Sequence, residues 1–430
     1  MEVVLANLKQ QTPEEILEAL QAGDVKLDID ESKQQGKDIF EQKTESILRC
    51  IDYSHSNLSP EAQQLLLCLA PFTSVIDTQI LNNYSNHLKQ QPALASLPFE
   101  RWPEVIRETH NWGLLSPDPD IPRFLRLQPI LPYFLRNRLY TPEQVEVRSA
   151  IEIAFREHYD ELGGMLYQLL QSKDPKERQV GQLLIGLEYE NLVTALNLAL
   201  KAQVPIRNPY FALFHYLMLI QDQQRGLELS QKVREGLESY TPDKLIGPLG
   251  GNLAIVIDRI AIVQLKIKQF ASAKASYESE LSIWEQNKSY DPKVIKLNVA
   301  SIYHQLGKVA QEQRQWPQAE AYYQRALQIY VEFNDRYAQS NTYGQLGLLA
   351  EAQQQWQQAR DYLLQTLQIF AEYEDNYSAG IVLRSLARLW KTGGDAGIPA
   401  SVAKILGASV EETEKLLREM LEGDEDKTGE

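Results

Sequence analysis

One pattern of residues occurs twice between residues 303 and 370, with the two copies forty residues apart. The first copy is Tyr303, Leu306, Gly307, Ala310, Trp316, Ala319, Tyr322 and Leu327, and the second is Tyr343, Leu346, Gly347, Ala350, Trp356, Ala359, Tyr362 and Leu367. A fixed period of this length is typical of stacked helical units, each too small to bury its own apolar face. We therefore expect an α-solenoid, whose stacked helices form a surface that can hold another molecule.

Shorter versions of the pattern flank the two full copies. Before them come Phe270, Ala273, Tyr277, Leu281 and Trp284, which match the first full copy at an offset of 46 residues. The six extra residues fit a loop at 287–292. A half copy follows at Tyr377, Leu386 and Ala387, and the consecutive glycines Gly393 and Gly394 end its helix. The repeats are therefore expected to extend over residues 241–391.

Within each unit, small residues are expected where two helices cross, and large residues are expected to fill the remaining space. This arrangement resembles the tetratricopeptide repeat, whose pattern has Leu-Gly in the first helix and two alanines in the second. Gly307, Ala319 and Ala326 match that pattern, whereas the next unit has Thr366 for the last Ala and the weak copy has Ala261 and Glu280. The forty-residue period resembles the kinesin-light-chain-like variety. The packing residues that the resemblance implies are Gly307, Trp316, Ala319, Tyr323, Ala326, Gly347, Trp356 and Ala359.

Tetratricopeptide repeats usually bind a protein or peptide along the concave face formed by their first helices. Transferred by position, that face is expected to carry Ser301, His304, Lys308, Gln311, Asn341, Gln345 and Glu351. It is polar and mixed in charge, and the Lys and Asn pattern that clamps a C-terminal carboxylate is incomplete. The alternative interpretation of these residues is a solvated helix face.

The N-terminal half has a different pattern, in which helices are followed by a short hairpin. Ser59, Pro60 and Glu61 predict a helix start, and Asp77 can cap a later helix. Residues 114–116 and 124–127 predict two strands around a turn. Helices followed by a hairpin predict a winged-helix-like domain at residues 44–140, and residues 141–240 are expected to be a helical transition region.

The order of these parts resembles the region that follows the ATPase core of bacterial STAND proteins, the NB-ARC-type signalling ATPases. The motif Glu190-Asn191-Leu192 with Ala195 and Leu196 adds to this resemblance. It implies that residues 1–43 are a remnant helical, ARC-like segment and linker, and that the nucleotide-binding domain is missing or separately encoded. Gln128 stands where that family has a nucleotide-sensing His, although Gln128 could instead cap a helix that starts at Pro129.

Composition and missing motifs limit the function. The net charge of −15 does not favour nucleic acid and favours basic or neutral partners. Cys50 and Cys68 fit a reducing compartment, and without a targeting segment or a long apolar run we expect a cytoplasmic protein with no membrane contact. The sequence has no phosphate-binding Gly-x-x-x-x-Gly-Lys motif, and its six histidines lack metal-ligand spacing. We expect no catalytic residue, metal or cofactor.

The sequence thus predicts a mainly α chain with a winged-helix-like domain followed by an α-solenoid. Beyond the repeats we expect C-terminal helices at 392–421 and a disordered acidic tail at 422–430. The predicted function is a non-enzymatic protein-interaction and sensor module, the C-terminal part of a STAND-type signalling protein without its nucleotide-binding domain. The alternative is a winged-helix DNA-binding regulator with a repeat sensor.

Overall fold

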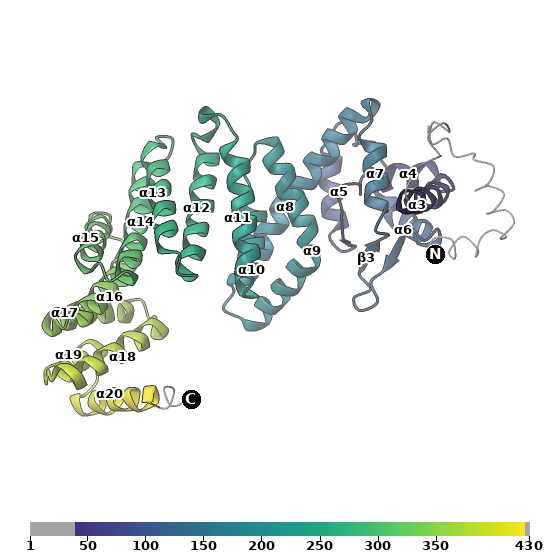
Figure 1. Cartoon of the computed structure of the whole chain (residues 1–430). Coiled ribbons are helices and arrows are strands. Elements are labelled where there is room, and N and C mark those ends of the chain that lie inside the picture. The colour runs from purple at the N-terminus through teal and green to yellow at the C-terminus, as the bar shows by residue number, and fades with distance from the viewer. Residues whose placement is uncertain (1–38, 426–430) are drawn as a thin grey trace. The chain divides into compact units, whose positions relative to one another are not determined.

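The computed structural model describes the backbone of residues 39–425 and the side chains of residues 48–421. The chain separates into two compact units, Met1–Gly226 and Leu227–Glu430. Most of the remnant segment expected at 1–43, and the side chains of the acidic tail expected at 422–430, lie outside the described residues. Among the described residues the fold is mainly α-helical, as the sequence predicts (Figure 1).

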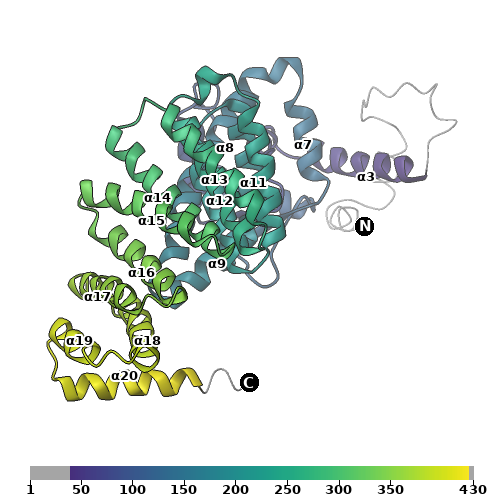
Figure 2. The ribbon, with the colours of Figure 1, turned by 60° about the vertical axis from the view of Figure 1, so that its left-hand side comes forward.

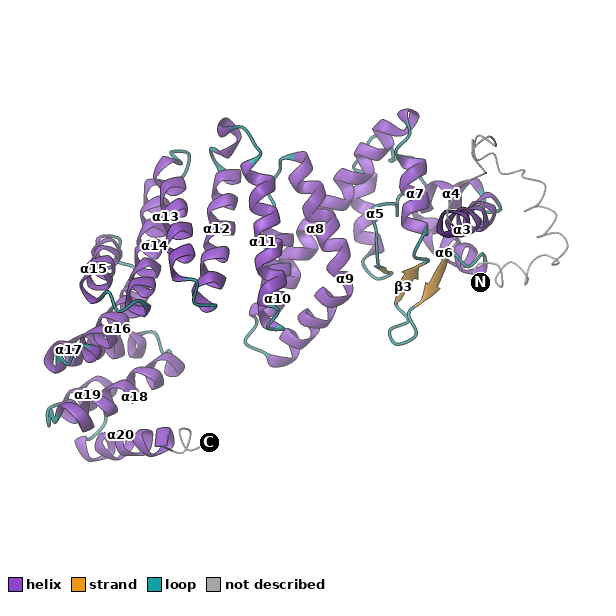
Figure 3. Ribbon diagram, in the orientation of Figure 1, coloured by secondary structure: helices purple, strands orange, loops and turns teal. Residues whose placement is uncertain are grey.

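Unit 1 begins with helices and a small sheet, whose strands are orange in Figure 3. Its elements are α3 (Ile39–Ser56), α4 (Pro60–Leu67), β1 (Val75–Asp77), α5 (Leu81–Lys89), a 3-10 turn (Phe99–Arg101), α6 (Trp102–Asn111), β2 (Leu115–Pro117), β3 (Phe124–Leu127) and α7 (Leu131–Leu139). The strand order is β1-β3-β2, and both pairs are antiparallel. The β2–β3 hairpin is the one that the sequence predicts.

Two details of this region differ from expectation. Asp77 does not cap a helix: it ends β1, and α5 begins four residues later at Leu81. The last helix, α7, begins at Leu131 rather than at Pro129, and the Leu131 N–H donates to the backbone carbonyl of Gln128. The capping interpretation of the Gln128 side chain is wrong, because the cap position of α7 is Ile130 and no side chain makes a cap hydrogen bond there. Its match to the sensing His stays a prediction.

The rest of unit 1 is a group of long helices. After the 3-10 turn Pro142–Gln144 come α8 (Val145–Gln171), α9 (Pro175–Ala202) and α10 (Arg207–Leu219), and α11 (Gln223–Glu238) crosses the boundary between the units. Helices α8, α9 and α10 pack on one another, α5 and α7 pack on α8, and β1 packs on α9. The sheet region and the helix group therefore share one packed interface.

Unit 2 is built from helix pairs that stack in chain order (Figure 2). Its elements are a 3-10 turn (Pro242–Leu245) and helices α12 (Pro248–Lys266), α13 (Phe270–Gln286), α14 (Pro292–Glu312), α15 (Trp316–Glu332), α16 (Arg336–Ala352), α17 (Trp356–Glu372), α18 (Asn376–Gly393), α19 (Ile398–Leu406) and α20 (Val410–Glu425). The pairs α12–α13, α14–α15 and α16–α17 have the closest packing, and α18 continues the stack. The six-residue insertion after α13 is the loop that the sequence predicts.

Close packing within a pair depends on glycine. A Cβ atom at Gly307 would lie 2.5 Å from the ring of Tyr323, and one at Gly347 would lie 2.8 Å from Leu363 Cγ. Tyr323, like Ala319 and Ala359, is fully buried. The small residues of the repeat therefore set the distance between its two helices, as the pattern predicts.

The joints between pairs also repeat. Lys296 forms an ion pair with Glu332 at 2.7 Å, and forty residues later Arg336 forms one with Glu372 at 2.9 Å. Asp335 and Asp375 cap the N-termini of α16 and α18 through backbone N–H groups three residues on. Surface ion pairs of this kind contribute little stability, but their repetition fixes the same register at successive joints.

The turns inside and between pairs use residues other than glycine in the left-handed region. Lys268, Arg314 and Gln354 end the first helix of a pair with φ of 62°, 58° and 60°, and Asn334 and Glu374 end the second with φ of 52° and 55°. Left-handed backbone is strained for residues with a Cβ, so each turn is held by the packing on either side of it.

Two helices, α9 and α12, are long and apolar enough to cross a membrane by length and composition alone. In the apolar 18-residue stretch of α12, 61% is buried inside the fold, and in the corresponding stretch of α9 the buried share is 39%. Buried core helices have the same composition, and α12 packs against α13.

Candidate functional site

A hollow of 540 Å³ lies among the first helices of the repeat pairs. It is lined by Ile262, Leu265, Lys266, Lys268, Gln305, Lys308, Gln311, Glu312 and Gln345. These residues come from α12, the turn that follows it, α14 and α16. We call the space that they line the basic hollow. Three lysines face one glutamate, so the local charge is positive although the chain carries −15.

The structure brings three of the predicted partner-binding residues into the basic hollow: Lys308, Gln311 and Gln345. Asn341 and Gln345 line a second hollow between α16 and α18. Ser301 is exposed on α14, and Glu351 lies 3.6 Å from Arg388 Nε; neither lines these two hollows. Lys266 and Lys268 were missed, because the concave-face positions were transferred only to the two full copies of the repeat.

The His304 side chain packs against residues of the neighbouring helices. Its Nδ1 lies 3.1 Å from Thr342 Oγ1, and its ring contacts that of Tyr323 at 5.5 Å between centroids. Burial, together with the nearby Lys308 charge, lowers the pKa of His304 to about 4. The imidazole is therefore neutral at physiological pH and fills the space between α14 and α16.

A second constellation joins the two parts of unit 1 around Asn191 of α9, which is fully buried. Its Oδ1 accepts from Thr73 N at 2.9 Å and from Thr73 Oγ1 at 3.2 Å. Its Nδ2 donates to the Val75 carbonyl and to Glu188 Oε2, both at 2.8 Å. One side chain thus holds the start of β1 against α9, and the role falls on the Glu190-Asn191-Leu192 motif singled out from the sequence.

Glu188 completes this network. Tyr159 donates its hydroxyl to Glu188 Oε2 at 2.7 Å, while Glu188 Oε1 is buried with no hydrogen-bond partner among the described residues. Burial raises the pKa of Glu188 to about 7, and the hydrogen bonds from Asn191 and Tyr159 oppose that rise. The glutamate is 2% exposed, so its charged form has little access to water.

This shift predicts a pH dependence of stability. An acid whose pKa rises from 4.5 to about 7 on folding binds more protons in the folded state, so stability falls as pH rises between those values. In the wild type, the unfolding free energy should fall by roughly 3 kcal/mol as pH rises across this window. In Glu188→Gln this fall should be absent, because glutamine does not titrate. The measurement is the unfolding free energy of wild type and variant in denaturant at pH 4.5, 6 and 8. A difference between them that does not change with pH would contradict the assignment.

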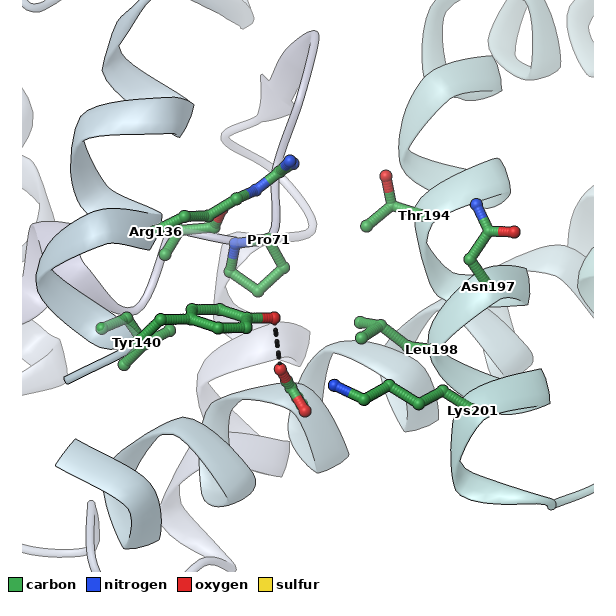
Figure 4. A pocket seen from close by; sticks show the side chains of 10 residues that line it. Pro71, Arg136, Tyr140, Thr194, Asn197, Leu198 and Lys201 are labelled. Atoms are coloured by element: carbon green, nitrogen blue, oxygen red, sulfur yellow. Dashed lines mark hydrogen bonds between the residues drawn. The ribbon is translucent and has the colours of Figure 1, made fainter. Parts of the chain in front are cut away.

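A third hollow, of 270 Å³, lies between α7, α8 and α9 (Figure 4). Arg136 and Tyr140 face Thr194, Asn197 and Lys201 across it, and Tyr140 donates its hydroxyl to Glu152 Oε1 at 2.6 Å. Arg136 Nε donates to the Ala70 carbonyl at 3.2 Å. Among the lining residues, Arg136 and Lys201 are basic and Glu152 is the single acid.

The arginines near the β2–β3 hairpin are engaged by buried acids. Arg123 pairs with Asp77 at 3.0 Å, Arg126 with Asp118 at 2.7 Å and Arg138 with Asp52 at 2.5 Å. In α6, Arg107 pairs with Glu104 at 3.3 Å. The positive charges of Arg123, Arg126 and Arg138 are therefore neutralised locally. Across residues 48–421, no cluster of His, Cys, Asp and Glu is arranged to hold a metal ion.

The chain was compared with known proteins. Residues 298–372 match the tetratricopeptide repeat family, and no curated protein sequence matches the chain. Solved structures that resemble it include BtubC (BKLC) from P. vanneervenii, at 16% identity over 62% of this chain and 92% of that chain, with a TM-score of 0.40. Aspartyl phosphate phosphatase F from Bacillus subtilis aligns at 12% identity over 81% and 84%, with a TM-score of 0.41.

A further solved structure is a signal transduction ATPase with numerous domains (STAND) from Pyrococcus horikoshii, which has a tetratricopeptide repeat sensor. It aligns at 14% identity over 98% of this chain and 71% of that chain, with a TM-score of 0.36. The matched residues 298–372 cover α14–α17, the two pairs that carry the full pattern. Residues 298–372 are therefore tetratricopeptide repeats, which typically serve as non-catalytic scaffolds for protein interaction.

Proposed function

We propose that this chain is a sensor module whose repeats bind an acidic peptide segment of a partner protein in the basic hollow. The observation that carries the proposal is the cluster of Lys266, Lys268 and Lys308 around a single acid, Glu312, at the first helices of a tetratricopeptide array. The net charge of the whole chain favours basic or neutral partners. A bound ligand interacts mainly with the charges that line its site, and in the basic hollow these are mostly positive.

The shape of the hollow also supports a peptide. At 540 Å³ it falls within the roughly 300–1,000 Å³ of ligand pockets, and it is open to solvent along the helices. Ile262 and Leu265 supply apolar contact area, while the amides of Gln305, Gln311 and Gln345 can pair with a peptide backbone. This combination suits an extended chain with acidic side chains.

Charge reversal in the hollow tests the proposal. We expect Lys308→Glu to weaken the binding of acidic peptides by roughly tenfold or more, because one attractive charge becomes repulsive. The measurement is fluorescence anisotropy with peptides first selected on an array graded from acidic to basic. Lys293→Glu is the matched control, because Lys293 is an exposed residue of the same helix outside the hollow.

Three results would remove the proposal: no peptide on the array binds, basic peptides bind as well as acidic ones, or the two variants bind alike. Binding in the hollow should also weaken as salt is raised, because exposed charges are screened.

We further propose that residues 44–140 are a winged-helix domain of a STAND-type protein whose nucleotide-binding domain is encoded elsewhere. Its support is the order of helices, hairpin and repeats, together with the sheet order β1-β3-β2. The test is whether an adjacent reading frame encodes a phosphate-loop domain that co-purifies with this chain. Tight ATP binding by the chain alone would count against this proposal.

The DNA-binding alternative has less support. A reading surface needs free cations, whereas Arg123, Arg126 and Arg138 are paired with aspartates, and α6 carries Glu104 and Glu108. Electrophoretic shifts that persist at physiological salt would revive this alternative.

A further inference from the structure

The second hollow lies between α16 and α18 over α17, has a volume of 240 Å³ and is lined at positions where successive repeats differ. We call it the Gly344 hollow. Its lining is Ser340, Asn341, Gly344, Gln345, Leu348, Leu363, Thr366, Phe370, Ser378, Ile381, Val382 and Ser385. All of these side chains are neutral, and the apolar ones lie beside hydroxyl and amide groups.

The preceding repeat shows what fills this space elsewhere. His304 occupies the position forty residues before Gly344, and it reaches Thr342 on the next first helix at 3.1 Å. Tyr323 in that repeat corresponds to the smaller Leu363. A Cβ atom at Gly344 would lie 3.6 Å from Thr366 Cγ2, an ordinary contact, so packing alone does not demand glycine there. Glycine at 344 therefore leaves empty a space that a side chain fills one unit earlier.

We infer that the Gly344 hollow receives one bulky, uncharged side chain of the bound peptide. Its volume is below the roughly 300 Å³ at which pockets for drug-sized ligands begin, and above the roughly 150 Å³ of a cavity that holds benzene. A single aliphatic or aromatic side chain fits that range. A charged one does not, because no lining residue in the described part of the chain could neutralise it.

The Gly344 hollow neighbours the basic hollow, because Gln345 lines both. A peptide that places acidic side chains near Lys308 can therefore place an apolar one beside Ile381, which is 45% exposed at the rim. The inference rests on the proposed peptide binding for its biological setting. The hollow itself can be tested without any peptide.

The direct test uses amino-acid amides as probes: N-acetyl-leucinamide and N-acetyl-phenylalaninamide against N-acetyl-aspartamide and N-acetyl-lysinamide. Saturation-transfer NMR should detect weak binding of the neutral pair to the full chain. Gly344→His should reduce it by roughly tenfold or more by filling the space as His304 does. Gly380→His is the control, because no described atom lies within 4 Å of a Cβ atom at that helical glycine.

If Gly344→His folds poorly, a second variant, at Ile381, tests the same hollow. Ile381→Ser removes an exposed apolar wall without touching the core, and it should weaken the neutral probes alone. The inference is overturned if the neutral probes do not bind, if charged probes bind equally well, or if Gly344→His and Gly380→His give the same result. Failure of the charge-graded peptide array with intact probe binding would instead remove only the proposed function.

Discussion

Gly307→Ala is expected to lower the unfolding free energy of the repeat unit by roughly 2–4 kcal/mol, although alanine is the better helix former. The added Cβ would lie 2.5–2.6 Å from two ring atoms of Tyr323, which is fully buried. Because the ring has no space to retreat, α14 and α15 must separate. The shift would also strain the hydrogen bond of 2.9 Å that the Tyr323 hydroxyl donates to Gln311 Oε1.

The measurement is equilibrium unfolding in denaturant, with Gly380→Ala as the matched control. That glycine is also inside a helix of the stack, α18, but meets no described atom within 4 Å. Its replacement should therefore stabilise by up to about 1 kcal/mol, the difference in helix propensity. If both alanine variants stabilise, close helix approach at Gly307 does not set the repeat geometry.

Asn191→Ala should destabilise unit 1 by roughly 3–5 kcal/mol, because it leaves several buried groups without partners at once. The Thr73 N–H and the Val75 carbonyl each lose the side-chain partner that they have in the fold, and Glu188 loses a donor. Loss of that donor also favours the protonated form of Glu188, so the variant should be least stable at high pH.

Hydrogen exchange gives this prediction a local readout. The Thr73 amide is held by Asn191 Oδ1, so its protection should fall most. Asn197→Ala is the control, because Asn197 is an exposed residue of the same helix. Its effect should stay within about 0.5 kcal/mol. Equal effects of the two substitutions would show that β1 is held to α9 by other contacts.

The repeat region was predictable because its signal is local and occurs more than once. Gly307 and Gly347, with their partners at helical spacing, specify a helix pair within forty residues, and the structure has that pair at each position. The β2–β3 hairpin was predictable from its turn residues. In contrast, β1 has three residues, all buried, and so short a strand shows no alternation that could reveal it.

The hollows of unit 2 were predictable only in part. Lys308, Gln311 and Gln345 follow from the register of the two full copies, whereas Lys266 and Lys268 lie in the weaker copy, to which no concave-face positions were transferred. The network at Asn191 joins residues 118 positions apart, and no local pattern encodes such a contact. Net charge averages over the whole surface, so it gave no sign of the locally positive basic hollow.

The repeated ion pairs at Lys296–Glu332 and Arg336–Glu372 have an evolutionary consequence. The two joints use equivalent contacts, so a duplicated forty-residue repeat would make the same contacts with the repeats on either side of it. Duplication or deletion in the gene could therefore add or remove whole repeats. The residues beside the hollows differ from unit to unit, as His304 and Gly344 do. Inheritance can therefore preserve the stacking while single substitutions change the surface of each unit.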